Sequence, residues 1–165
     1  MSSNQDNFID KAFMVIADLL IKLLPVPLNQ KRAFAYYRKG MTAHAEGEYA
    51  EALENYFLAL SLEEDLNARS YILYNIALIY GRTGSTMQAI DFYLLALDAN
   101  PFLCQAWNNL GVIYHALGIY SIDLKEFEVA QSCFSKAARM WRIVAFLEPD
   151  SYPEVNNWLK INGLI

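Results

Sequence analysis

The sequence predicts an all-α fold of stacked helical hairpins, and two observations support this prediction. The first is composition, because 55% of the 165 residues are apolar and 14% are aromatic, enough to fill the core of one domain. The second is self-similarity, because one order of small and aromatic residues returns after 37 positions and again after 34. A fixed period of about 20 to 50 residues is typical of stacked supersecondary units.

The repeat is visible in two sets of matched positions. A shift of 37 places Tyr36, Gly40, Gly47, Ala52, Tyr56 and Ala59 onto Leu73, Ala77, Gly84, Ala89, Tyr93 and Ala96. A further shift of 34 places Leu73, Ile76, Ala77, Tyr80 and Gly84 onto Trp107, Leu110, Gly111, Tyr114 and Gly118. A period of 34 residues is the length of the tetratricopeptide repeat, a pair of antiparallel helices, which this sequence therefore resembles.

Small residues are expected to bring the two helices of each hairpin close together. Gly40, Ala77 and Gly111 occupy equivalent positions on the three first helices. Ala52 and Ala89 occupy the facing positions on the second helices of the first two repeats. Larger side chains at these places would push the helices of a pair apart.

The third repeat contains an insertion. Tyr93 and Trp141 are 48 residues apart, as are Pro101 and Pro149, and this separation exceeds the period by 14. Fourteen residues are two heptads, so seven added to each helix would lengthen both by about two turns and keep their packing faces in phase. We therefore predict an extended third hairpin with its turn near residues 122–125.

These patterns divide the chain into five segments. They are an N-terminal apolar helix with a proline-containing linker (1–30), repeat 1 (31–66), repeat 2 (70–103), repeat 3 with the extended hairpin (104–151) and a capping helix (152–165). In the last segment, Ser151 and Glu154 have the spacing of a capping box ahead of a helix that runs through Lys160. Such a helix would cover the end of the stack, as solenoid ends require.

The segment from Phe8 to Leu24 predicts a nearly continuous apolar helix that ends before Pro25. It carries four charges and is shorter than the roughly 20 apolar residues that a membrane span needs. Two interpretations stay open: the helix packs on the first repeat or in the groove of the solenoid, or it lies in a membrane interface or docks on a membrane protein. The start of the chain resembles neither a secretory signal nor a transit peptide, so if the protein works inside an organelle, we expect it to be made there.

Composition and spacing argue against several other functions. A net charge of -5 and a pI near 5.0 give no basic field for nucleic acid. Cys104 and Cys133 are 29 residues apart with no histidine at ligand spacing, which suggests core residues in a reducing compartment. His44 and His115 are too few for a metal site, and phosphate loops and catalytic triads are missing. We therefore expect no enzyme activity, catalytic residue, metal, cofactor or small-molecule substrate.

In tetratricopeptide proteins, the outward face of each first helix lines a groove that binds a peptide. The resemblance implies that the matching residues here bind a protein partner: Phe34, Tyr37, Arg38, Met41, Tyr71, Tyr74, Asn75, Leu78, Arg82, Gln105, Asn108, Asn109, Val112 and His115, with His44 beside them. Aromatic rings would supply contact area and amides would bond to a peptide backbone. Alternatively, about half of them, foremost Phe34 and Tyr71, only pack within the protein.

One known activity of that family can be tested by residue type. Members that grip the terminal carboxylate of a chaperone tail use Lys and Asn on the first repeat. Here Tyr37 and Met41 occupy those places, so we do not expect a carboxylate clamp.

Longer strings of residues go beyond what a repeat requires. They are Asn7 to Lys11, Ala33-Phe34 with Tyr36 to Arg38, Glu46-Gly47 with Tyr49 to Leu53, Arg69 to Ile76, Asn100-Pro101 and Asn157 to Lys160. In these strings, the chain from Asn7 to about Asn162 resembles the photosystem I assembly proteins of plastids and cyanobacteria, which have three tetratricopeptide repeats and an extended third one. It departs from them at Leu124-Lys125-Glu126, where the family favours Gly-Asp, and at Leu66-Asn67-Ala68, where it favours Pro-Tyr-Asp.

This resemblance implies a non-catalytic assembly chaperone or scaffold at the thylakoid surface. Its partners would be newly made photosystem I subunits and other assembly factors, with peripheral membrane contact on the stromal side in a plastid or the cytoplasmic side in a cyanobacterium. The alternative is a general adaptor that joins soluble proteins and has no membrane role.

Overall fold

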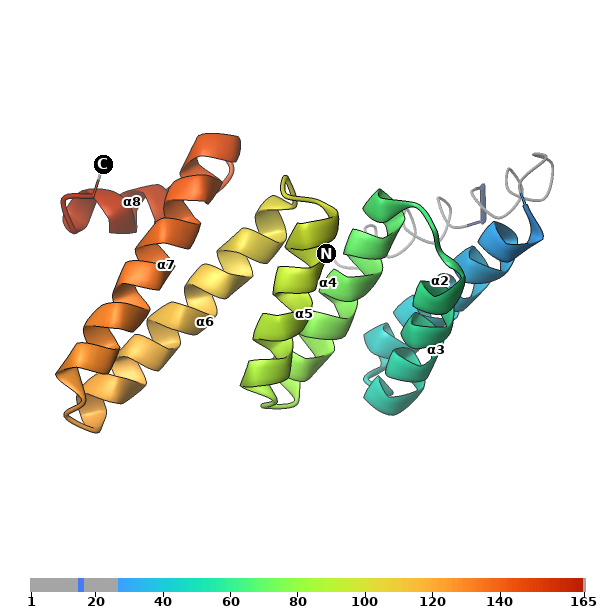
Figure 1. Cartoon of the computed structure of the whole chain (residues 1–165), viewed down its shortest axis with the longest axis horizontal. Helices are drawn as coiled ribbons and strands as arrows, with labels where there is room; N and C mark the ends of the chain where they lie inside the picture. The colour runs from blue at the N-terminus through green and yellow to red at the C-terminus, as the bar shows by residue number, and fades with distance from the viewer. Residues whose placement is uncertain (1–14, 17–26, 165) are drawn as a thin grey trace, which may run out of the picture. The chain divides into compact units, whose positions relative to one another are not determined.

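The computed structural model describes residues 15–16 and 27–164, and from residue 27 onward its regular structure is entirely α-helical (Figure 1). The helices are α2 (Leu28–Glu46), α3 (Tyr49–Leu62), α4 (Leu66–Arg82), α5 (Thr86–Ala99), α6 (Cys104–Asp123), α7 (Phe127–Leu147) and α8 (Pro153–Ile161). They pair as α2–α3, α4–α5 and α6–α7, which confirms the predicted all-α fold of helical hairpins. Apart from residues 15 and 16, the predicted N-terminal helix lies outside the described residues. No helix within the described ranges has the length and apolarity to cross a membrane.

The chain divides into two compact units, residues 1–64 and 65–165, and the first contains the hairpin of α2 and α3. A β-carbon added to Gly40 would lie 2.7 Å from the Tyr56 ring and 3.2 Å from the carbonyl oxygen of Ala52. The absence of a side chain at Gly40 therefore allows the close approach of the helices that the sequence predicted. Tyr56 is fully buried behind this contact.

The second unit begins with the hairpin of α4 and α5. Asp65 caps α4, since its Oδ1 accepts a hydrogen bond from the Ala68 backbone N–H at 2.8 Å. The side chain of Asn100, just after α5, donates to Asn67 Oδ1 at 3.0 Å and so links the two ends of the hairpin. The helix α5 ends at Ala99, because Pro101 disfavours helical geometry at the preceding residue, Asn100.

The third hairpin, α6 and α7, is extended as predicted. Shifting the end of α4 by 34 positions gives Ala116, whereas α6 continues to Asp123. Shifting the start of α5 by 48 positions gives Phe134, whereas α7 already begins at Phe127. Each helix thus gains seven residues next to the turn, where Lys125 adopts a left-handed conformation with φ 63°.

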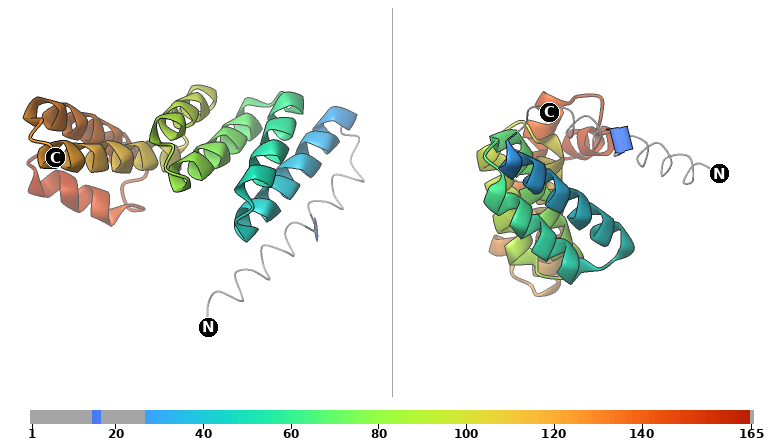
Figure 2. Two further views of the ribbon diagram at one scale, coloured as in Figure 1. Left: turned by 90° about the horizontal axis from the view of Figure 1, so that it is seen from below. Right: turned by 90° about the vertical axis from the view of Figure 1, so that its right-hand side faces the viewer.

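The helix α8 follows this hairpin and runs across the C-terminal half of α7 (Figures 1 and 2). Its buried residues Val155 and Leu159 join Trp141 and Val144 of α7 in one core cluster. The predicted capping box is wrong, because the helix starts at Pro153 and no side chain caps it. Tyr152 takes the capping position, so Ser151 and Glu154 are out of register for that motif.

Candidate protein-binding site

In the first unit, the predicted binding residues lie along α2. Phe34, Tyr37 and Arg38 are half-buried, and the Met41 side chain is 39% exposed. The ring centroid of Tyr37 lies 5.9 Å from that of the buried Tyr56. Tyr37 therefore packs within the hairpin as well as facing outward.

His44 also contacts Tyr56. The histidine Nδ1 and the Tyr56 hydroxyl are 3.4 Å apart. Burial, and secondarily the neighbouring Tyr37, raise the pKa of the Tyr56 hydroxyl. Tyr56 therefore stays neutral and serves packing.

In the second unit, the predicted residues lie on α4 and α6, and they differ in exposure. The exposed ones are Tyr71, Arg82, Gln105 and Val112, whereas Tyr74, Asn75, Leu78, Asn108, Asn109 and His115 are half-buried. Tyr71 and Val112 are 48% and 52% exposed, so about half of each apolar surface is open to a partner. We call the surface formed by these predicted residues of α4 and α6 the first-helix face. Tyr71 and Val112 are its most accessible apolar side chains.

Asn109 links three helices of the second unit. Its Nδ2 donates to the Tyr93 hydroxyl at 3.0 Å and to the Tyr74 hydroxyl at 3.4 Å. The rings of Tyr74 and Tyr93 are 5.7 Å apart. Burial raises the pKa of Tyr93 to about 12, although the hydrogen bond from Asn109 acts in the opposite direction. Asn109 therefore has a structural role, which sequence position alone did not reveal.

The Asn108 side chain is also fixed by a hydrogen bond, in this case from α7. Trp141 Nε1 donates to Asn108 Oδ1 at 3.1 Å. The Asn108 Nδ2 group and the Asn109 Oδ1 atom have no hydrogen-bond partner within the described part of the chain. The two amides thus present one oriented donor and one oriented acceptor, a pair suited to the N–H and C=O groups of a bound peptide.

His115 belongs to an aromatic cluster. Its ring centroid lies 5.4 Å from Phe134, 5.5 Å from Trp141 and 5.6 Å from Trp158. The two tryptophans are themselves 4.8 Å apart with nearly perpendicular ring planes. His115 therefore packs between α6, α7 and α8.

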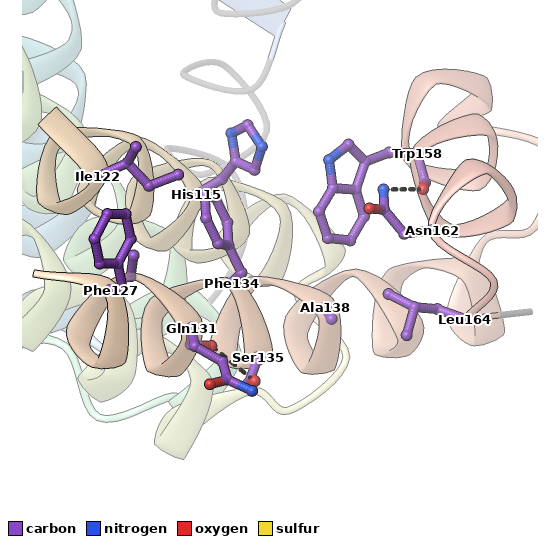
Figure 3. Close-up of a pocket in the computed structure, with 11 residues that line it drawn as sticks. His115, Ile122, Phe127, Gln131, Phe134, Ser135, Ala138, Trp158, Asn162 and Leu164 are labelled. Atoms are coloured by element: carbon purple, nitrogen blue, oxygen red, sulfur yellow. Dashed lines mark hydrogen bonds between the residues drawn. The ribbon is translucent and has the colours of Figure 1, made fainter. Parts of the chain in front are cut away.

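A pocket that the sequence did not predict lies in the second unit among these three helices (Figure 3). It has a volume of about 560 Å³ and is lined by His115, Ile122, Phe127, Ala130, Gln131, Phe134, Ser135, Ala138, Trp158, Asn162 and Leu164. Among the predicted site residues, it contains only His115. We call it the hairpin pocket. A sequence signal was the heptad spacing between Phe127, which lies in the inserted residues, and Phe134, which directly follows them.

Burial, followed by the nearby Glu148 carboxylate, raises the pKa of the Cys104 thiol to about 11, which keeps it protonated at neutral pH. Among the described residues, no group of three or more His, Cys, Asp and Glu side chains could hold a metal ion.

Known tetratricopeptide proteins share the sequence repeat and the fold of this chain. The sequence profile described as "Tetratricopeptide repeat" matches residues 35–66 and 70–102. The first tetratricopeptide domain of Spaghetti (RPAP3), bound to the HSP90 peptide SRMEEVD, has a TM-score of 0.58 at 22% identity over 79% of this chain and 90% of that one. The Arabidopsis OM64 tetratricopeptide domain also has a TM-score of 0.58, at 18% identity over 81% and 98%. At these identities the likeness concerns the fold.

Curated relatives are much more similar. Photosystem I assembly protein Ycf3 of Cyanophora paradoxa is 52% identical over 98% of this chain and 94% of its own length. The proteins of that name from Synechococcus elongatus and Chaetosphaeridium globosum are 51% and 49% identical, again over 98% of this chain. Identity at this level along almost the whole length of both proteins shows that the chain belongs to the Ycf3 family of photosystem I assembly proteins.

Proposed function

We propose that this protein is a non-catalytic assembly scaffold that holds newly made photosystem I subunits at the thylakoid surface. Family membership supports the role in photosystem I assembly. The tetratricopeptide hairpins support binding as the mode of action. Peripheral attachment on the stromal or cytoplasmic side of the membrane is part of the same proposal.

The observation that carries the binding mode is the mixed character of the first-helix face. Tyr71 and Val112 expose about half of their surface, and the free donor of Asn108 and acceptor of Asn109 are held in place by internal hydrogen bonds. Exposed apolar side chains provide the affinity and fixed amides orient a peptide backbone. Because a scaffold of this kind must also release its cargo, we expect micromolar affinity for a single segment.

A capture experiment with detergent-solubilised photosynthetic membranes tests this proposal. The site variant combines Tyr71→Ala with Val112→Ala, two exposed positions whose truncation leaves the buried core unchanged. The matched control combines Met87→Ala with Leu95→Ala on α5, where the two side chains are 68% and 50% exposed. Photosystem I subunits should be captured by the wild type and the control, and much less by the site variant.

The other outcomes are also informative. Equal capture by all three proteins would support the assembly role and refute the site. Capture of soluble proteins alone, together with absence of the protein from the membrane fraction, would favour a general adaptor with no membrane role.

A further inference from the structure

Most of the residues that line the hairpin pocket are apolar, and the pocket is open at the molecular surface. Ile122 and Phe127, close to the turn of the extended hairpin, are 44% and 66% exposed. Phe134 and Trp158 line the pocket beside His115, whose ring they both contact (Figure 3). Large apolar side chains left exposed around a hollow mark an interaction site. The volume of about 560 Å³ falls within the range of roughly 300 to 1,000 Å³ that is usual for ligand pockets.

The pocket is elongated along α7. Its lining runs from Phe127 to Ala138, eleven residues along the helix, which correspond to about 16 Å at about 1.5 Å each. That length matches about three turns of a second helix laid alongside. An amphipathic helix places apolar side chains on one face at intervals of three and four residues, and four such side chains, at positions i, i+4, i+7 and i+11, span the same distance of about 16 Å.

Positive charge lies beside the pocket, although the whole chain has a net charge of -5. Arg139 and Arg142 follow the lining residues Ser135 and Ala138 by four positions, so each lies one turn further on the same side of α7. The Arg142 guanidinium donates to the carbonyl oxygen of the lining residue Leu164 at 3.2 and 3.3 Å. Within the described residues, neither arginine pairs with a carboxylate. Two cations are therefore available to a partner at this end.

The opposite end of the pocket carries negative charge. Asp123, Glu126 and Glu128 lie at or next to the turn of the hairpin, where Lys125 is the one cation between residues 122 and 128. These carboxylates would repel an anionic membrane surface. The charge distribution therefore favours a protein segment over lipid headgroups.

We propose that the hairpin pocket binds an amphipathic helical segment of a partner protein. Large apolar side chains of that segment enter between Phe127 and Trp158, and an acidic side chain at one end contacts Arg139 and Arg142. This site is separate from the first-helix face apart from His115, and the proposal does not depend on the photosystem role.

Selection from a random library tests the proposal without a known partner. Phage-displayed peptides of about 16 residues, long enough for four helical turns, are selected on the full-length protein. The recovered peptides should combine Leu or Phe at helical spacing with Asp or Glu near one end. Their affinities are then measured by fluorescence anisotropy with the synthetic peptides.

Four variants locate the binding. Phe127→Ala and Arg139→Glu should each weaken binding by about tenfold, the loss expected when one anchor is removed. The matched controls are Phe102→Ala and Lys160→Glu, and neither should change the affinity for the peptides. Phe102 is an exposed phenylalanine just before α6, and Lys160 lies about 200° around α8 from Trp158. Both test residues are exposed, so all four variants should show unchanged circular dichroism.

A charge exchange provides the sharpest evidence. Replacing the acidic residue of a selected peptide by Lys should weaken its binding to the wild type and restore its binding to Arg139→Glu. The proposal is overturned if no peptide is enriched, if the selected peptides lack acidic residues, or if Phe127→Ala and Arg139→Glu bind them as the wild type does. It is also overturned if vesicles of phosphatidylglycerol bind at these residues and the peptides do not.

Discussion

The contact between Gly111 and Trp141 offers a direct test of how the extended hairpin is held together. Gly111 is buried in α6, and an added β-carbon would lie 2.7 Å from Trp141 Cδ1 and 2.8 Å from Cε2, with Nε1 closer still. No carbon fits there unless the indole moves. Because Trp141 Nε1 donates to Asn108 Oδ1, that movement would also break the hydrogen bond.

The cost of Gly111→Ala can be worked out from these contacts. Overpacking in a tight core costs about 1 to 3 kcal/mol. Loss of the hydrogen bond adds about 0.5 to 1.5 kcal/mol. The higher helix propensity of Ala offsets about 1 kcal/mol of this destabilisation. The free energy of unfolding should therefore fall by about 0.5 to 3.5 kcal/mol, which lowers the Tm by about 1 to 14 °C in a chain of this size.

Gly81→Ala is the matched control, because Gly81 lies inside α4 but is exposed. Its added β-carbon would meet only the Ala89 side chain, at an ordinary 3.9 Å. With no overpacking, helix propensity should stabilise this variant by up to about 1 kcal/mol. Both variants are measured by urea unfolding followed by circular dichroism and tryptophan fluorescence. If Gly111→Ala were as stable as Gly81→Ala, the reasoning about close helix approach would be refuted.

Three further predictions concern the turn, the thiols and the buried tyrosines. Lys125→Gly should raise the free energy of unfolding by about 0.5 to 1 kcal/mol, because Lys125 has φ 63° and glycine tolerates the left-handed region, whereas Lys125→Ala should not. When the native protein is treated with iodoacetamide near pH 8, mass spectrometry should find the label on Cys133 and none on Cys104. Cys104 is protected because it is 1% exposed and its pKa is raised to about 11. Labelling of Cys104 without unfolding would contradict this prediction. Stability should fall as the pH rises from about 10 to about 12, since the folded state holds the Tyr93 proton more tightly than the unfolded state, and Tyr93→Phe should show a shallower fall in pH-dependent unfolding.

Most of the fold was predictable because small residues recur at equivalent positions of the repeats. Gly40 and Gly111 recur where two helices touch, and glycine in a helix has little other reason to recur at a fixed period. The insertion could be divided between the two helices because seven residues keep a helical face in phase. The start of α8 was misplaced because the capping-box spacing of Ser151 and Glu154 competes with Pro153, which favours the first helical turn.

The binding surfaces were harder to predict, because side-chain partners come from other helices. Asn108 and Asn109 were expected to face a peptide, yet each is also bonded to an aromatic side chain of another helix. The hairpin pocket depends on residues that have no equivalent in the first two repeats. Phe127 lies in the inserted turns and Trp158 lies on α8, so a comparison between repeats could not align them.

Trp141 contributes to both surfaces of the second unit, since it bonds to Asn108 on the first-helix face and contacts His115 and Trp158 beside the hairpin pocket. A ligand that shifts this indole would alter the orientation of the Asn108 amide as well as the walls of the pocket. Binding at the two places is then linked, and thermodynamic reciprocity requires that each ligand change the affinity of the other by the same factor. Cargo held at one surface could in this way set when a second protein joins or leaves at the other.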